Sequence, residues 1–139
     1  MTSHNQFDVA TRQLERAIIL YLEEADYYSA ATLAGASEEI LGCKLKTLGG
    51  MHALDSMISA ITEIQTANDV QPLNRKKLRD DVLNEVRNWL KHYRYNEDLD
   101  FDDRDAAASL IDRAVSNYFK LTGQKTPTMI RFTNLDSES

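Results

Sequence analysis

The chain has few of the residues that interrupt helices, with two prolines and five glycines among its 139 residues. It has one cysteine, the residue type that forms disulfides. The single cysteine, Cys43, cannot form a disulfide within the chain, and we expect it to pack rather than to act as a nucleophile. No apolar run approaches the roughly 20 residues needed to span a bilayer, and no charged-then-apolar signal segment opens the sequence. These absences predict a cytoplasmic protein without a membrane partner, whose fold depends on its own apolar core.

What the chain does have is helix-forming residues. Hydrophobic residues make up 42% of it, and long stretches are rich in alanine, leucine, glutamate, arginine and lysine, which lose little freedom in a helix. A chain of this length buries roughly two-thirds of its unfolded surface as one domain. We therefore expect an all-α fold, an up-and-down bundle of about five helices, within a single domain of residues 1–123.

Apolar periodicity and turn residues locate these helices. They are expected at about residues 8–25, from 30 to the glycine pair at 49–50, at 51–67, at 73–95, and from Asp102 or Asp103 to near Gly123. Ser29 is a candidate N-cap of the second helix. Residues 124–139 show no helical period, and we expect an extended or mobile C-terminal tail there.

Charge is distributed unevenly along the chain, whose formal net charge is −6. This acidity argues against non-specific binding of nucleic acid, which depends on contacts with phosphates. Residues 71–95, however, hold seven basic and three acidic residues, whereas residues 96–105 hold one basic and six acidic ones. Both segments are interpreted first as solvated faces. A second interpretation makes them docking surfaces, with an RNA-binding cluster at Arg75, Lys76, Lys77 and Arg79.

The expected helix at 73–95 has two distinct faces on a helical wheel. The apolar face lies within about 80° of one line and comprises Leu78, Val82, Leu83, Val86, Trp89, Leu90 and Tyr93. The opposite face comprises Asn84, Arg87, Asn88, Lys91, His92 and Tyr95. We expect the first face to contact the core, with Trp89 and Tyr93 as packing residues rather than base-stacking platforms.

Three residues of the polar face, Arg87, Asn88 and His92, offer the parts of a phosphodiester-cleaving site that needs no metal. Asn88 and His92 lie side by side because they are four residues apart, and Arg87 can lean across to them. A guanidinium suits phosphate, an amide can orient a neighbour, and an imidazole can both accept and donate a proton near neutral pH. An ordinary solvated helix face has the same composition, so spacing alone does not decide between the two.

Residues 87–92, Arg-Asn-Trp-Leu-Lys-His, resemble the signature of the HEPN domain, an arginine followed after four to six residues by histidine and often directly by asparagine. Residues 29–42 resemble the HEPN helix in which an alanine-rich stretch leads to a glutamate, here Glu38 or Glu39. The two segments occur in the family's order, and the resemblance covers about residues 8–122. It implies a bundle of four or five helices that often dimerises, so that two Arg/His motifs share one cleft.

Many HEPN domains are metal-independent endoribonucleases, in which a 2′-hydroxyl attacks the adjacent phosphodiester and leaves a cyclic phosphate. By this resemblance, His92 exchanges the proton, Arg87 holds the phosphate and Asn88 positions the group. Some members are toxins whose nucleotidyltransferase antitoxin modifies a tyrosine two residues after the histidine. Position 94 is arginine in this chain, so Tyr95 would have to substitute. The residues expected to flank the site are Glu38, Glu39, Lys91 and Tyr95, with a solvated pair as an equal alternative for the two glutamates.

Two functions follow from the resemblance: an RNA-cleaving homodimer in a toxin or defence system, with RNA and an antitoxin or nucleotidyltransferase as partners, and a non-catalytic module that binds nucleotides or proteins. A purely structural helical dimer is a third interpretation. No cofactor is expected, and no metal, because His4 and His52 lack ligand spacing with a cysteine or carboxylate. The sequence contains no glycine-rich phosphate loop or nucleophile elbow.

Overall fold

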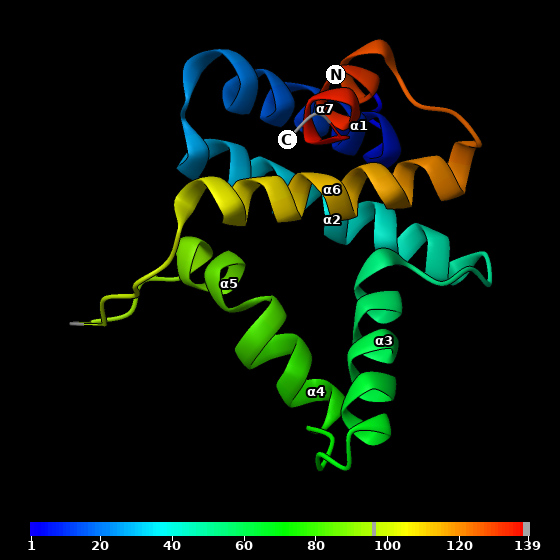
Figure 1. The fold of residues 1–139 in the computed structure, drawn as a ribbon. Helices are drawn as coiled ribbons and strands as arrows, with labels where there is room; N and C mark the ends of the chain where they lie inside the picture. The colour runs from blue at the N-terminus through cyan, green and yellow to red at the C-terminus, as the bar shows by residue number, and fades with distance from the viewer. Residues whose placement is uncertain (96, 138–139) are drawn as a thin grey trace.

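The computed structural model describes residues 1–95 and 97–137, and all regular structure among them is helical, which confirms the all-α class (Figure 1). The α-helices are α1 (Gln6–Ile19), α2 (Tyr27–Thr47), α3 (Ala53–Ala67), α4 (Arg75–Lys77), α5 (Glu85–Lys91), α6 (Asp103–Thr122) and α7 (Pro127–Ser137). Two π-helical segments, η1 (Leu20–Glu24) and η2 (Leu78–Leu83), continue α1 and α4. The described residues thus hold more helical segments than the five expected. None of these helices is long and apolar enough to cross a membrane.

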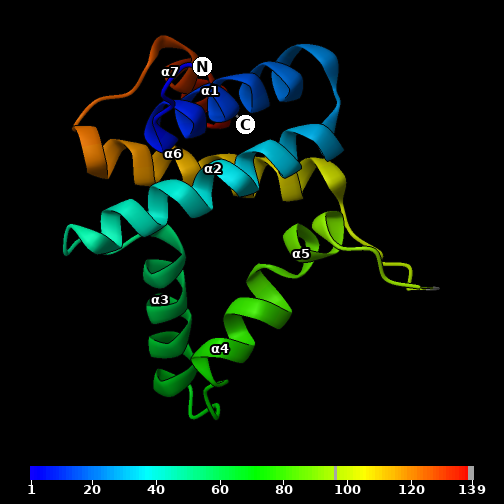
Figure 2. The same cartoon turned by 180° about the vertical axis from the view of Figure 1, so that it is seen from behind.

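Helices α1, α2, α6 and α7 form what we call the bundle, residues 6–47 and 103–137. Helices α2 and α6 run side by side along its middle, and α1 and α7 lie on one side of this pair (Figures 1 and 2). Buried alanines in α2 and α6 let the helices approach closely, because an alanine side chain adds little bulk at a crossing. The largest fully buried apolar side chains of the bundle are Leu14, Ile18, Leu41, Ile111 and Met129.

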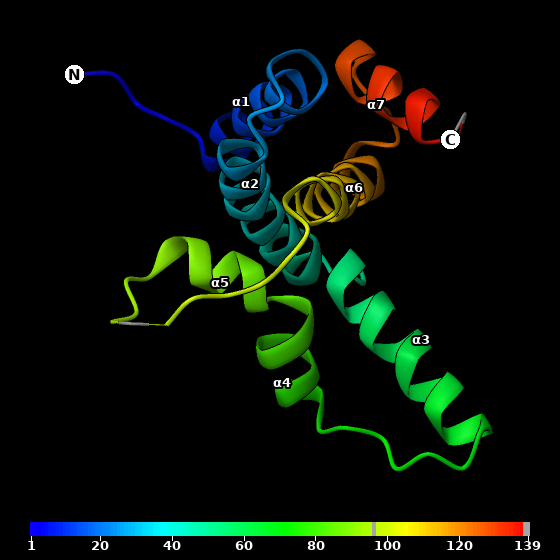
Figure 3. The ribbon, with the colours of Figure 1, turned by 60° about the vertical axis from the view of Figure 1, so that its left-hand side comes forward.

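The remaining helices form what we call the arm, residues 53–91. Helix α3 and the α4–η2–α5 segment both project from the bundle on the same side (Figures 1 and 3). A small separate apolar cluster joins them, with Leu54, Ile58 and Leu78 buried and Ile61 and Leu83 partly buried against it. The arm therefore has much less apolar packing of its own than the bundle.

Of the four residues predicted to cap or end a helix, three have the predicted role. Asp102 caps α6 by accepting a hydrogen bond from the amide of Asp105 at 2.8 Å, and Gly123 ends that helix with a φ of 73°. Gly49, with a φ of 84°, follows α2 as expected. The start of α2 was predicted wrongly, because Asp26 caps it from one turn earlier by accepting from the amide of Ser29 at 3.2 Å.

The expected continuous helix at 73–95 is wrong. The segment begins at Arg75, becomes π-helical at Leu78, breaks at Asn84 (φ −107°, ψ 9°) and ends at Lys91. A π-helical turn holds more residues than an α-turn, so the faces before and after the break do not follow one wheel. Val82 and Tyr93, predicted to contact the core, are 52% and 87% exposed.

The expected extended tail after residue 123 is also wrong. Residues 127–137 form α7, whose Met129 and Phe132 are buried in the bundle core. Pro127 stands at the first helical position, where its missing amide hydrogen and fixed φ are tolerated, so it starts this helix instead of excluding one. Cys43 was predicted to pack, but it is exposed.

Candidate functional site

The two segments that the sequence singled out meet in the structure. Arg87 of α5 places its Nη1 atom 3.0 Å from Oε2 of Glu38 on α2, across 49 residues of sequence. Both side chains are well covered, at 13% and 4% exposure. This ion pair attaches the end of the arm to the middle of the bundle.

Arg113, which the sequence analysis did not single out, completes the cluster from α6. Its Nη2 atom donates to Oε1 of Glu38 at 3.0 Å and to Oδ1 of Asn84 at 2.8 Å, and its Nη1 atom donates to the carbonyl of Leu83 at 3.2 Å. Arg113 and Asn84 are both buried. Arg113 thereby holds Glu38 in place. It also donates hydrogen bonds to a backbone carbonyl and to a side-chain oxygen at the break between η2 and α5.

The helical wheel predicted that Asn84 and Arg87 point away from the core, and this prediction is wrong. The break at Asn84 turns both toward α2 and α6, where they join the buried cluster. A sequence signal for Arg113 did exist, since a charged residue stands within the apolar period of the helix around Ile111 and Ala114. A charge at such a position calls for a buried partner of opposite sign.

Within this cluster, two guanidinium groups share one carboxylate. The Nε atoms of Arg87 and Arg113 are buried and have no hydrogen-bond partner among the described residues. One positive charge is therefore unmatched by the contacts that the cluster makes. Such an arrangement favours an additional anion, because a buried cation is costly without a counter-charge.

Small and polar residues of α2 and α6 make room for the cluster. A Cβ atom on Gly35 would lie 2.8 Å from Cγ of Arg87, so glycine lets the arginine cross α2. One turn beyond Arg113, the buried Asn117 donates to the carbonyl of Glu38 at 3.3 Å and accepts from the amide of Ala53 at 2.7 Å. Asn117 therefore ties the start of the arm to the same stretch of α2.

His92 follows the last residue of α5 and lies outside the contacts that join Arg87, Glu38 and Arg113. It is the C-terminal cap of α5, with extended backbone (φ −124°, ψ 131°), and its amide donates to the carbonyl of Asn88 at 3.2 Å. The imidazole is exposed and lines an open hollow of about 510 Å³ together with Trp89, Lys91 and Tyr93. Because the helix ends here, the backbone no longer holds His92 on the α-helical wheel with Asn88.

The other predicted site residues are dispersed around this centre. Lys91 and Glu39 form an exposed ion pair at 3.5 Å, beside the Arg87–Glu38 pair, and Tyr95 is 78% exposed. The basic cluster Arg75, Lys76, Lys77 and Arg79 lies on α4 and the start of η2, at the far end of the arm from α5 (Figure 1). Two of its members already have acidic neighbours, since Arg75 lies 3.7 Å from Asp55 and Arg79 lies 3.1 Å from Asp80.

No metal centre is formed by the part of the chain that the structure describes, where no three histidine, cysteine or acidic side chains are grouped to hold an ion. His52 instead caps α3, its Nδ1 atom accepting from the amide of Asp55 at 3.1 Å. Comparison with protein-family models, with curated proteins and with solved structures finds no match to this chain.

Proposed function

We propose that the chain is an HEPN-like domain that acts as a metal-independent endoribonuclease, with Arg87, Asn88 and His92 at its centre. His92 would take the proton from the attacking 2′-hydroxyl or return it to the leaving oxygen, because it is the exposed imidazole of the site. Arg87 would hold the scissile phosphate and stabilise the charge that develops on it. In this proposal two chains form a homodimer in the cytoplasm, as part of a toxin or defence system.

The observation that carries the proposal is the 3.0 Å contact between Arg87 and Glu38. The two segments that resemble HEPN motifs lie far apart in the sequence and contact each other in the structure, as expected if both belong to one site. Their contact also explains why a glutamate follows the alanine-rich stretch: small residues such as Gly35 admit the arginine, and Glu38 orients it.

Glu38 need not prevent Arg87 from binding a phosphate. When the Arg87 guanidinium turns toward an anion, the carboxylate keeps its second arginine, because Arg113 donates to the other oxygen. Buried Arg113 thus acts as a positioning residue that holds Glu38 in place through the second carboxylate oxygen. The unmatched positive charge of the cluster favours the approach of phosphate.

A second candidate is a non-catalytic module that binds nucleotides or proteins. The observation in its favour is that Arg87 is 13% exposed and already engaged by Glu38, as expected of a residue that stabilises the fold. In that case Arg87 serves the attachment of the arm, and His92 is a solvated helix cap. RNA binding without cleavage would identify this candidate.

The two candidates separate in one RNA-cleavage assay, performed with the wild type, His92→Ala and His4→Ala in the presence of a chelator. His4 is an exposed histidine that precedes α1, so its replacement is a matched control. The proposal predicts cleavage to a cyclic phosphate that survives chelation, is unchanged in the control, and falls about 10² to 10⁴-fold in His92→Ala. Equal cleavage by all three proteins, or loss on chelation, would refute the assigned chemistry.

A further inference from the structure

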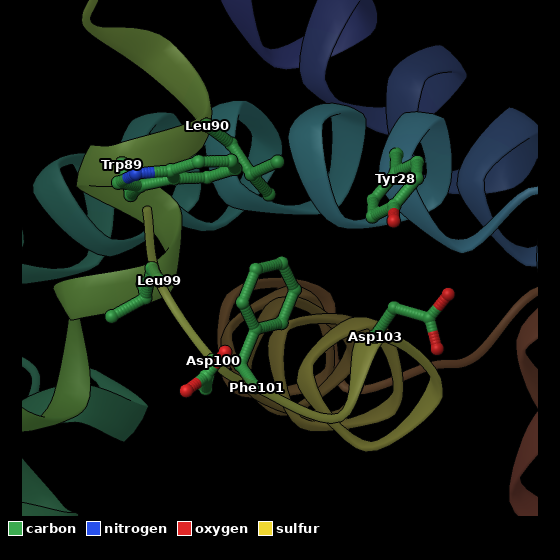
Figure 4. A pocket seen from close by; sticks show the side chains of 7 residues that line it. All are labelled: Tyr28, Trp89, Leu90, Leu99, Asp100, Phe101 and Asp103. Carbon is green, nitrogen blue, oxygen red and sulfur yellow. The ribbon is translucent and has the colours of Figure 1, made fainter. Parts of the chain in front are cut away.

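A second hollow lies on the other side of Trp89, where the start of α2, the end of α5 and the start of α6 converge (Figure 4). It has a volume of about 800 Å³. The residues that line it are Tyr28, Trp89, Leu90, Leu99, Asp100, Phe101 and Asp103. Three aromatic rings and two carboxylates in one open hollow form a combination that the ribonuclease proposal does not use.

The rings are ordered by contacts among themselves. Phe101 rises between the other two (Figure 4), with ring centroids 5.9 Å from Trp89 and 6.5 Å from Tyr28, both edge to face. The indole Nε1 atom of Trp89 donates to the carbonyl of Glu97 at 2.9 Å, which sets the orientation of that ring. Tyr28 is 60% exposed. Aromatic faces that stay accessible to solvent attract cations through the quadrupole of the ring.

Charge around the hollow has one predominant sign. Of the six acidic residues at 97–105, Asp102 and Asp103 accept hydrogen bonds from backbone amides at the start of α6, and Glu97 pairs with Arg94 at 2.9 Å. Asp98 and Asp100 form no ion pair with any residue that the structure describes. The hollow therefore combines ring faces with a local excess of negative charge, which repels phosphates and attracts cations.

We propose that this hollow receives an arginine side chain from a basic segment of a partner protein. A guanidinium is planar and always charged, so it stacks on aromatic rings while its N–H groups reach carboxylates, which the compact ammonium of a lysine cannot do. The acidic residues beside the hollow would hold further basic residues of the same segment. A nucleobase fits the rings but not the charge, because its phosphates would face residues 97–105.

This docking site adjoins the candidate ribonuclease site without depending on it. Trp89 and Leu90 line both this hollow and the one that contains His92. A partner bound through its arginine would therefore stand beside His92 and could control access to it. Whether or not His92 is catalytic, the binding itself can be measured.

The chain carries its own reporter, since Trp89 is its single tryptophan. A capped peptide with two arginines is titrated into the full chain while tryptophan fluorescence is recorded, next to a peptide in which citrulline, the uncharged analogue, replaces arginine. The proposal predicts a saturable change with the arginine peptide and a dissociation constant at least about tenfold weaker with citrulline. Absence of a saturable change, or equal binding of both peptides, would overturn it.

Two aspartates two residues apart provide a matched pair of variants. Asp100→Asn and Asp98→Asn change the net charge equally, but only the first alters the lining of this hollow. We expect Asp100→Asn and Tyr28→Ala each to weaken the arginine peptide about fivefold, and Asp98→Asn to weaken it less than twofold. Equal weakening by both aspartate variants would mean that long-range charge, and not the hollow, binds the peptide. Guanosine monophosphate that binds more tightly than the peptide would identify a nucleobase site instead.

Discussion

The bundle and the arm are held together by different interactions. In the bundle, α1, α2, α6 and α7 enclose one large apolar core, whereas the arm has a satellite cluster around Leu54, Ile58 and Leu78. Helix α5 is attached to the bundle by polar contacts, the ion pair of Arg87 with Glu38 and the bonds from Arg113 to Leu83 and Asn84. It is also attached by Leu90, which packs against the bundle core. Apolar packing therefore builds the scaffold, and a buried charged cluster, together with Leu90, holds the part that carries the candidate site.

The largest effect is expected from removing the charge that joins both regions. Arg113→Met should lower the free energy of unfolding by about 3 to 5 kcal/mol, because Asn84 and the carbonyl of Leu83 lose their buried donor. The control is Arg131→Met, which removes an exposed pair with Glu23 and should cost less than about 1 kcal/mol. Denaturant titration measures both. Similar losses in the two variants would mean that the buried cluster contributes no more than a surface ion pair.

A core substitution in each region tests the contrast in apolar packing. Ile111→Ala in the bundle should cost about 2 to 5 kcal/mol on unfolding by denaturant. Ile58→Ala should cost less, because its cluster contains few buried neighbours and the arm can relax around the gap. An equal or larger loss for Ile58→Ala would show that the arm is packed as tightly as the bundle.

How far the sequence predicted this contrast depends on the region. Apolar periodicity located the bundle helices α1, α2 and α6, although Asp26 and not Ser29 caps α2, and α7 was missed. The same reasoning failed in the arm, where the π-turn at Leu78–Leu83 and the break at Asn84 shift the faces of the helix. Such a break depends on Arg113, which binds it from 29 or 30 residues away, and local periodicity contains no information about that partner.

The site shows the same division. The resemblance placed Glu38 or Glu39 near the site without choosing between them, and the exposure of His92 followed from the wheel. The buried place of Asn84 and the role of Arg113 did not, because tertiary contacts determine both.

A smaller effect is expected where the arginine crosses the bundle. Gly35→Ala should cost about 1 kcal/mol in the wild type, because the added Cβ displaces the Arg87 side chain from Glu38. In an Arg87→Ala background the same change should stabilise by up to about 1 kcal/mol, since alanine favours a helix over glycine. The coupling between the two substitutions, measured by denaturant unfolding, tests the crossing. Additive effects would show that Gly35 does not serve Arg87.

The smallest effect on stability is expected from the exposed His92. His92→Ala should change the free energy of unfolding by less than about 0.5 kcal/mol, because the side chain is exposed and its removal leaves no cavity. Thermal and denaturant unfolding of the purified variant check this. A loss above about 2 kcal/mol would show that His92 supports the fold, and the cleavage assay could then no longer be interpreted as a test of chemistry.

The most direct test of the two-region account is native-state hydrogen exchange at low denaturant, in the wild type and in Arg87→Ala. The account predicts that amides of α3 and α5 exchange through an opening well below the free energy of global unfolding, while those of α2 and α6 exchange only through global unfolding. The contact of Arg87 with Glu38 is broken both when the arm opens and when the whole chain unfolds. Arg87→Ala should therefore lower the free energy of arm opening and the free energy of global unfolding by the same amount. A single opening free energy shared by α2, α3, α5 and α6 in the wild type, or an arm opening that Arg87→Ala leaves unchanged, would contradict the account.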